Sequence, residues 1–280
     1  MGTVFRRLDA DDFDFAINLS EKEKWYLTAY DLGLYVIDGQ GAGTVAVDSG
    51  TPVGMATAAI YGGSAWIGNV VIEPASRNRG LGRKLVEAHM RALNASGVDS
   101  FFLYAYDRSR PLYERMGFTF DAMLWEIALT GARGKDSGEV SHGYDSALEK
   151  ADLRYFPCSR KHVLVRSAAR KDAEVIIHRD PNGDVDGYLF TSFVDSKYGS
   201  EVAPFVCRIE DAGTLIAASA AASAGGSIHM YVPENNIGTL ERQGFALRRL
   251  RRIHRGYAGS SACLPVLGPE VMSAGFLETG

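Results

Sequence analysis

The stretch Arg77-Asn78-Arg79-Gly80-Leu81-Gly82 lies between an apolar segment, residues 65–72, and a helical pattern of buried-type residues that ends near Gly97. Its glycines let the backbone approach a ligand, and the free N–H groups and dipole of a helix start favour anions. The arginines add charge that pairs well with phosphate oxygens. A basic glycine turn between a buried strand and a helix therefore predicts a site for a phosphate-rich, nucleotide-like ligand.

The whole chain has the composition of a globular protein. It has 280 residues, of which 46% are hydrophobic and 23% charged, enough for one large domain or two of ordinary size. No apolar run approaches the ~20 residues of a membrane span, and Met1–Arg7 lacks the apolar core of a secretory signal. The formal net charge of −4 gives no support to nucleic-acid binding. We expect a soluble, cytoplasmic protein with neither a membrane nor a nucleic acid as partner.

Cysteine and histidine usage indicates no metal site. Cys158, Cys207 and Cys263 are widely spaced, odd in number and not paired as Cys-x-x-Cys. This pattern is typical of reduced thiols in a cytoplasmic protein. The six histidines are scattered and form no metal-ligand spacing with Cys or Glu, so no metal is expected.

The chain divides at a polar, glycine-rich segment. Residues 130–143 contain four glycines and almost no large apolar side chain, which favours a linker. Before it, the patterns predict strands near 4–8, 44–48, 53–61, 65–72 and 100–106, a helical region from 9 to about 35, and helices after Gly80 and at 111–116. After it come further helices and strands to about 253. We predict one domain at 1–130, a linker at 131–143 and a second domain at 144–280.

The two halves contain similar sequences near the end of their predicted cores. Leu112–Phe118 (LYERMGF) matches Thr239–Phe245 (TLERQGF), and each segment follows one predicted strand and precedes another, which indicates an internal repeat. The second copy is shorter because Cys207–Asp211 runs almost directly into a helix, with no basic glycine turn. Leu240 also stands where the first copy has Tyr113. The second half therefore keeps the scaffold and lacks the phosphate-binding loop.

The order strand, Arg-x-x-Gly-x-Gly, helix, strand, LYERMGF resembles the GNAT superfamily of acyl-CoA-dependent N-acetyltransferases. Arg77, Gly80 and Gly82 fill the family motif Q/R-x-x-G-x-G/A. The resemblance covers about 3–130 fully and extends to about 257 in degenerate form, as in tandem GNAT proteins. It implies an α/β fold with a mixed, mostly antiparallel sheet, parallel where a crossover helix joins the fourth and fifth strands. The first domain would be catalytic and the second degenerate.

The resemblance also implies roles for individual residues, with acetyl-CoA as the acyl donor. The strand residues Val70, Val71 and Ile72 would pair their backbone with the pantetheine arm. Tyr113 would lie near the coenzyme sulfur, either as a general acid for the departing thiolate or as its hydrogen-bond donor. The pyrophosphate would be held by Arg77, Asn78, Arg79, Gly80, Leu81, Gly82 and Arg83.

The general base is where the chain departs from the family. Neither 67–72 nor 101–106 contains an acid, and Tyr106 replaces an asparagine that is common in the family. The acids that remain as candidates are Glu21, Glu23, Asp31 and Asp107. Trp25, Tyr26 and Tyr30 could line an acceptor pocket or belong to the core.

Other polar groups leave open what the second half does. His229, Tyr231, Glu234 and Asn235 fit either a ligand site or a strand end with a helix cap. The arginine-rich run 248–255 fits a strand with a solvated face, or one packed on a partner. The sequence predicts an N-acetyltransferase acting on a small-molecule or protein amine, with a second domain that shapes the acceptor pocket or a homodimer surface. The alternative is a CoA-linked sensor without turnover.

Overall fold

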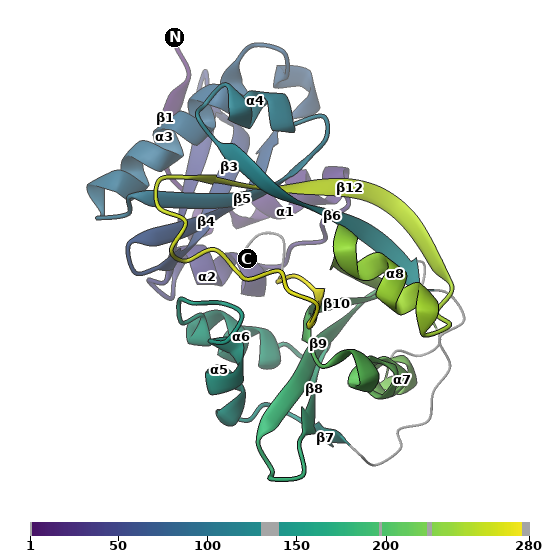
Figure 1. Cartoon of the computed structure of the whole chain (residues 1–280). Coiled ribbons are helices and arrows are strands. Elements are labelled where there is room, and N and C mark those ends of the chain that lie inside the picture. Colours follow the sequence, from purple (N-terminus) through teal and green to yellow (C-terminus); the bar gives the residue numbers. More distant parts are fainter. Residues whose placement is uncertain (1, 130–139, 196–197, 223–225, 276–280) are drawn as a thin grey trace.

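The computed structural model describes residues 2–129, 140–195, 198–222 and 226–275, which form one extended sheet with helices packed on it (Figure 1). The strands are β1 (Val4–Arg7), β2 (Gly41–Asp48), β3 (Thr51–Tyr61), β4 (Ser64–Ile72), β5 (Ser100–Tyr106), β6 (Thr119–Leu129), β7 (Val140–His142), β8 (Ala173–Arg179), β9 (Val185–Asp195), β10 (Gly199–Val206), β11 (Ile228–Pro233), β12 (Leu247–Ala258) and β13 (Val271–Ser273). The helices are α1 (Phe13–Glu23), α2 (Ala29–Val36), α3 (Leu81–Ala95), α4 (Arg110–Glu114), α5 (Ala147–Asp152), α6 (Lys161–Ala168), α7 (Ala212–Ala222) and α8 (Glu234–Arg242), with short 3-10 turns η1 (Ala10–Asp12), η2 (Pro74–Ser76) and η3 (Ile209–Asp211). None of the helices in these described ranges is long and apolar enough to cross a membrane.

The sheet is mixed and mostly antiparallel, as the sequence predicts. Its order is β1-β2-β3-β4-β5-β12-β6-β11-β10-β9-β8-β7, with β13 paired to β10. The pairs β4–β5 and β10–β11 are parallel, and the others are antiparallel. Each parallel pair is joined by a crossover helix, α3 in the first half and α7 in the second. Of the expected linker, residues 131–139 lie outside the described residues, and Val140–His142 form β7 against β8.

The two halves exchange strands at the centre of the sheet. Strand β12, which follows α8 in the second half, lies between β5 and β6 of the first half. Strand β6 in turn pairs with β11 of the second half. Arg255 of β12 fixes this arrangement: its Nε and Nη2 donate to Asp121 of β6 at 3.0 and 2.7 Å. Its Nη1 donates to the carbonyl of Pro265 at 2.6 Å. Each half therefore completes the sheet of the other.

The internal repeat is confirmed by matching local geometry. The unit β5–α4–β6 in the first half corresponds to β11–α8–β12 in the second. Both helices end in a left-handed glycine, Gly117 (φ 90°) and Gly244 (φ 86°). In each, the next phenylalanine donates its N–H back to the helix, Phe118 to Tyr113 at 3.0 Å and Phe245 to Leu240 at 3.3 Å. Glycine adopts this φ without strain, which explains why the repeated motif ends in Gly-Phe.

The helices of the first half cover both faces of its sheet. Successive residues of a strand point to opposite faces. Val45 and Met55 therefore lie in the core cluster under α1, whereas Ala46 and Ala56 lie in the cluster under the start of α3. This sandwich holds the end of β4 and the start of α3 in fixed positions.

The expectation of reduced thiols is wrong for two of the three cysteines. Cys158, which precedes α6, and Cys263, which follows β12, form a disulfide with their Cα atoms 5.3 Å apart. Their separation of 105 residues gave no sign of this pairing, because only the tertiary fold brings the two segments together. Cys207 is free and buried, and burial raises the pKa of its thiol.

Candidate functional site

The basic glycine turn connects β4 to α3 as the sequence predicts. After η2 the chain turns through Asn78 (φ 62°) and Gly80 (φ 74°), both left-handed, before α3 begins at Leu81. Asn and Gly are the residues that adopt this conformation most readily. A Cβ at Gly80 would have no heavy atom within 4 Å, so the surface over the turn is open. The first N–H groups of α3 therefore face an open surface, where an anion can reach them.

The arginines of the turn differ in what holds them. Arg77 donates its Nε to the carbonyl of Ile72 at 2.9 Å and pairs with Glu23, so it braces the end of β4. Arg79 pairs with Asp48 at 2.8 Å, and Arg83 pairs with Glu87 at 2.7 Å. The last two are largely exposed, and pairs of this kind contribute only about 0–1 kcal/mol. A phosphate group could therefore displace the acids at small cost.

Strands β4 and β5 separate beyond the middle of their length. Their pairing ends at Ile67–Leu103, although β4 continues to Ile72. Asn69 adopts φ 49° and donates its Nδ2 to the Thr57 hydroxyl at 2.9 Å, at an irregularity in the β3–β4 register. Among the residues that the structure describes, the edge of β4 from Gly68 onward consequently has no strand partner on the β5 side.

A cavity of about 760 Å³ occupies this gap and continues into the second half. Of the expected cofactor-binding residues, all except Arg79 line it, as does Tyr113. Of the expected acceptor residues, Glu23, Trp25, Tyr26 and Asp31 line it and Asp107 does not. The second half contributes, among others, Arg170, Phe193, Tyr198, Glu201, Tyr231 and Arg251.

Tyr113 lies in the cavity wall beside the gap. Its side chain is 6% exposed and packs edge-on against Phe118, with ring centroids 5.7 Å apart. Within the described residues, its hydroxyl makes no hydrogen bond. Burial raises the pKa of this phenol above its usual value of 10, so the group stays protonated and keeps a hydrogen to donate.

The acids expected as bases are engaged in ion pairs. Glu23 pairs with Arg77 and, at 3.3 Å, with Arg108. Asp31 caps α2 through the Thr28 N–H at 2.8 Å and pairs with Arg170 at 2.5 Å. Each carboxylate is therefore already engaged with an arginine, and an amine in the cavity would have to compete with that contact. Glu21 is exposed and does not line the cavity.

Asp107 belongs to a separate, smaller hollow of about 430 Å³. His254 lies 2.6 Å and Arg252 2.9 Å from its carboxylate. The hydrogen bond to His254, with the charge of Arg252, lowers the pKa of Asp107. Asp107 therefore has contacts suited to joining β5 to β12 and poorly suited to taking a proton in the cavity.

The loop between α1 and α2 lines the cavity with Lys24, Trp25, Tyr26 and Leu27. The single helical region expected at 9–35 is broken there, because Lys24 (φ 62°) ends α1 in a left-handed conformation. Tyr26 also has a positive φ of 53° and stays exposed. Such a conformation is unfavourable for an aromatic residue. The loop is held by the buried Ser20, whose carbonyl and hydroxyl accept the N–H groups of Trp25 and Leu27.

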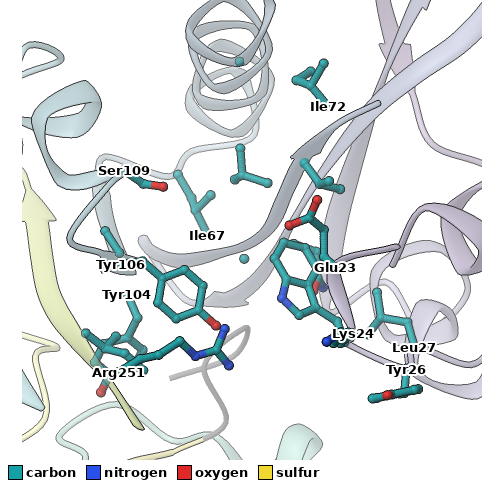
Figure 2. Close-up of a pocket in the computed structure, with 18 of the residues that line it drawn as sticks. Glu23, Lys24, Tyr26, Leu27, Ile67, Ile72, Tyr104, Tyr106, Ser109 and Arg251 are labelled. Atoms are coloured by element: carbon teal, nitrogen blue, oxygen red, sulfur yellow. The ribbon is translucent and has the colours of Figure 1, made fainter. Parts of the chain in front are cut away.

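A polar cluster from the central strands forms the opposite wall, and the sequence analysis missed most of it. Figure 2 shows Tyr106 and Arg251 together on one side of the cavity, across from Glu23, Lys24 and Leu27. Arg251 donates its Nε to Glu126 of β6 at 2.6 Å. The Tyr231 hydroxyl donates to Glu201 at 3.2 Å. Tyr231 was already a candidate for a ligand site, and a glutamate inside the apolar segment 123–129 was a further signal in the sequence that could have pointed here.

The corresponding gap in the second half is closed. Strands β10 and β11 pair only at Ser200–Ile228 and Glu201–His229 before they separate. Strand β13 enters the space between them and pairs with β10. On its other side, Ala274 donates its N–H to the Tyr231 carbonyl at 2.9 Å, and Ser273 Oγ accepts the Tyr231 N–H at 2.9 Å. The chain itself thus fills the position that is open in the first half.

One group in the described part of the chain has a geometry that could bind a cation. His178, Asp186 and Asp211 bring a ligand atom each within 4.8 Å of one another. The guanidinium of Arg208 already lies 2.9 Å from each aspartate. Because this cation supplies the positive charge and none of the four residues lines the cavity, the group fits an ion-pair cluster.

Comparisons with known proteins agree with this geometry. Residues 5–118 match the model of the acetyltransferase (GNAT) family, and residues 148–249 match a second model, an acetyltransferase (GNAT) domain. A crystal structure of a candidate acetyltransferase from Pyrococcus horikoshii superposes with a TM-score of 0.81 at 17% identity, covering 100% of this chain and 96% of that one. A tandem GNAT protein from the clavulanic acid biosynthesis pathway gives a TM-score of 0.64 at 15% identity over 92% of this chain and 98% of that one.

A curated relative matches a shorter stretch. Serotonin N-acetyltransferase 2 of rice (Oryza sativa subsp. japonica), a chloroplastic protein, is 36% identical over 76 residues. The match covers 26% of this chain and 37% of the rice protein's length.

Proposed function

This chain belongs to the GNAT family of acetyltransferases as a tandem of two GNAT domains, and on that premise we propose that it transfers an acetyl group from acetyl-CoA to a primary amine. The observation that carries the proposal is one cavity bordered by three features. They are the basic glycine turn, the unpaired edge of β4 and the protonated Tyr113.

The first half has the contacts that acetyl-CoA needs. The N–H groups at the start of α3, with Arg83 and Arg79 beside them, would hold the pyrophosphate. The unpaired edge of β4 at Val70–Ile72 would accept the pantetheine amides as an added strand would. Arg77 would support this edge through its bond to the Ile72 carbonyl. Because β13 fills the gap of the second half and no glycine turn precedes α7, one cofactor per chain is expected.

The reaction we propose is direct attack in a ternary complex. A neutral amine would attack the thioester carbonyl, and a backbone N–H from the Val70–Ile72 strand would meet the developing oxyanion. The C–S bond then breaks as the amide forms. The proton lost by the amine nitrogen balances the proton gained by the coenzyme sulfur. A thiol ordinarily has a pKa near 8.5, which is below the pKa of Tyr113. Tyr113 is therefore expected to donate a hydrogen bond to the leaving sulfur rather than to transfer its proton to it.

The acceptor side suits amines with an apolar body. Trp25, Tyr26 and Phe193 line this part of the cavity, two of them exposed. The similarity to a serotonin N-acetyltransferase supports including aromatic amines among the acceptors tested.

Coenzyme release measured over a panel of aromatic amines, polyamines, amino acids and peptide N-termini tests the proposal. We expect thiol release that depends on an acceptor. Acetyl-CoA binding without such release, for every amine, would support the sensor alternative instead.

Tyr113→Phe tests the role of the hydroxyl. It is expected to lower kcat about 100-fold while acetyl-CoA affinity stays within about 3-fold, because general-acid or leaving-group assistance typically contributes 10²–10⁴-fold. Tyr144→Phe is the matched control, since its hydroxyl bonds to Glu149 and lies outside the cavity. Unchanged turnover in Tyr113→Phe would remove this residue from the mechanism.

Calorimetry should give one acetyl-CoA bound per chain. A stoichiometry of two would contradict the closed gap of the second half.

A further inference from the structure

On the second-domain side of the cavity, Arg251 has terminal nitrogens that are left for a ligand. It lies on β12, lines the cavity, and its side chain is 52% exposed. Throughout the part of the chain that the structure describes, neither Nη1 nor Nη2 of Arg251 makes a hydrogen bond. Among the described residues, Arg83 at the glycine turn is likewise bonded only through its Nε, to Glu87. Two other cavity arginines differ: Nη2 of Arg77 pairs with Glu23, and Nη1 and Nη2 of Arg170 pair with Asp31 and Asp172.

The guanidinium of Arg251 is held from behind and from one face. Its Nε donates to Glu126 at 2.6 Å, and Glu126 is only 2% exposed. The ring of Tyr106 lies under the guanidinium, with the central carbon 4.7 Å from the ring centroid. Figure 2 shows the Arg251 side chain extended beside Tyr106 at the cavity wall. These two contacts fix the plane of the fork before any ligand arrives, which reduces the entropy cost of binding.

The charge distribution makes this wall attractive to an anion. Burial alone would raise the pKa of Glu126, but the nearby His229, whose Nδ1 lies 3.9 Å from the carboxylate, and the hydrogen bond from Arg251 outweigh it and lower the pKa. The carboxylate therefore stays charged, deep in the wall, and the guanidinium carries the positive end of the pair at the surface. Arginine keeps its proton at every ordinary pH, so the guanidinium itself stays positively charged.

The neighbours of Arg251 favour a singly charged ligand. Both Glu126 and Glu201 act on Tyr106 from close by, so a doubly charged phosphate would meet two carboxylates and one guanidinium. A carboxylate carries one charge, and its two oxygens match the two terminal nitrogens of the fork.

We propose that Arg251 binds a carboxylate of the acceptor, so that the substrate is an amine that also carries an acid group, as an amino acid does. This inference rests on the proposed acetyl transfer and deepens it. It also gives the second domain a function. Strand β12 comes from that domain but lies against β5, so the strand exchange brings Arg251 into the cavity of the first domain.

Acceptor pairs that differ only in the carboxylate test the proposal. Suitable pairs are tryptophan with tryptamine, phenylalanine with phenylethylamine, and lysine with cadaverine. We expect the native protein to show a higher kcat/KM for the acid member of at least one pair. Arg251→Gln should lower that value about 10- to 100-fold through KM, as for a lost charge-assisted hydrogen bond, and leave the decarboxylated amine within about 3-fold. Arg251→Lys should recover part of the loss.

Three controls keep the result specific to Arg251. Arg249→Gln removes a neighbouring arginine of the same strand that pairs with Glu241 outside the cavity, and it should have no effect on either member. Acetyl-CoA affinity should be unchanged in Arg251→Gln. Because this variant leaves Glu126 buried without its cation, Glu126→Gln combined with Arg251→Gln repeats the measurement without an unpaired charge.

The outcomes separate this inference from the proposed function. A native preference for the decarboxylated amines, or an equal loss for both members in Arg251→Gln, would overturn the role of Arg251 while acetyl transfer stands. If no amine reacts, the proposed transfer fails. Calorimetry of the same amino acids with the CoA-bound protein then decides the subsite, since binding that Arg251→Gln does not weaken would overturn it.

Discussion

Arg160→Met should destabilise the protein by about 3–5 kcal/mol, the usual cost of leaving one partner of a buried ion pair alone. Arg160 is 3% and Asp152 1% exposed in the core of the second half. Nε of Arg160 lies 3.2 and 3.0 Å from the two carboxylate oxygens of Asp152, and Nη2 lies 2.8 Å from one of them. Among the described side chains, Arg160→Met would leave the Asp152 carboxylate with the hydroxyl of Tyr188 as its hydrogen-bond donor.

The assay is urea unfolding of the native protein, Arg160→Met, Asp152→Asn and the double variant. Replacing both charges removes the unpaired carboxylate, so the double variant should be more stable than Arg160→Met alone by at least about 1 kcal/mol. The guanidinium also lies 3.2 Å over the ring of Phe156, a contact that methionine replaces with apolar packing. The reasoning is refuted if Arg160→Met costs less than about 1 kcal/mol, or if the double variant is the least stable of the four.

Two further predictions concern the first half and the closed gap. Burial lowers the pKa of His89 from 6.5 to about 4, so only the unfolded chain gains this proton as the pH falls between those values. Stability should therefore fall on acidification across that window by up to about 1.4 kcal/mol per pH unit, and urea titrations of His89→Gln should lack this contribution; equal slopes would argue against it. Met272 is fully buried in β13, so Met272→Ala should lower the free energy of unfolding by about 2–5 kcal/mol. Val266 is exposed, so Val266→Ala should lower it by less than about 0.5 kcal/mol. Comparable urea midpoints for these last two variants would mean that β13 does not stabilise the second half.

The part of the cavity wall that includes Glu23, Asp31 and Arg251 was the least predictable part of the site. The sequence predicted Glu23 and Asp31 as candidate bases. It did not predict their ion pairs with Arg77 and Arg170, because these arginines are distant in the chain. The sequence predicts Arg251 only as one charge of an arginine-rich strand that has a solvated face or packs on a partner. The arginines at 248, 249, 251 and 252 are exposed in β12, but which of them borders a cavity depends on the neighbouring strands.

The sequence by itself determined the features that depend on local geometry. The left-handed Asn78 and Gly80, the helix start at Leu81 and the repeated Gly-Phe helix ends follow from residues adjacent in the chain. Only the tertiary structure decided which strands meet. The exchange of β6 and β12, the entry of β13 between β10 and β11, and the Cys158–Cys263 disulfide join segments far apart in sequence. Backbone hydrogen bonding is the same for any strand, so the partner is selected by packing over the whole sheet, and that selection brings Arg251 to the basic glycine turn's cavity.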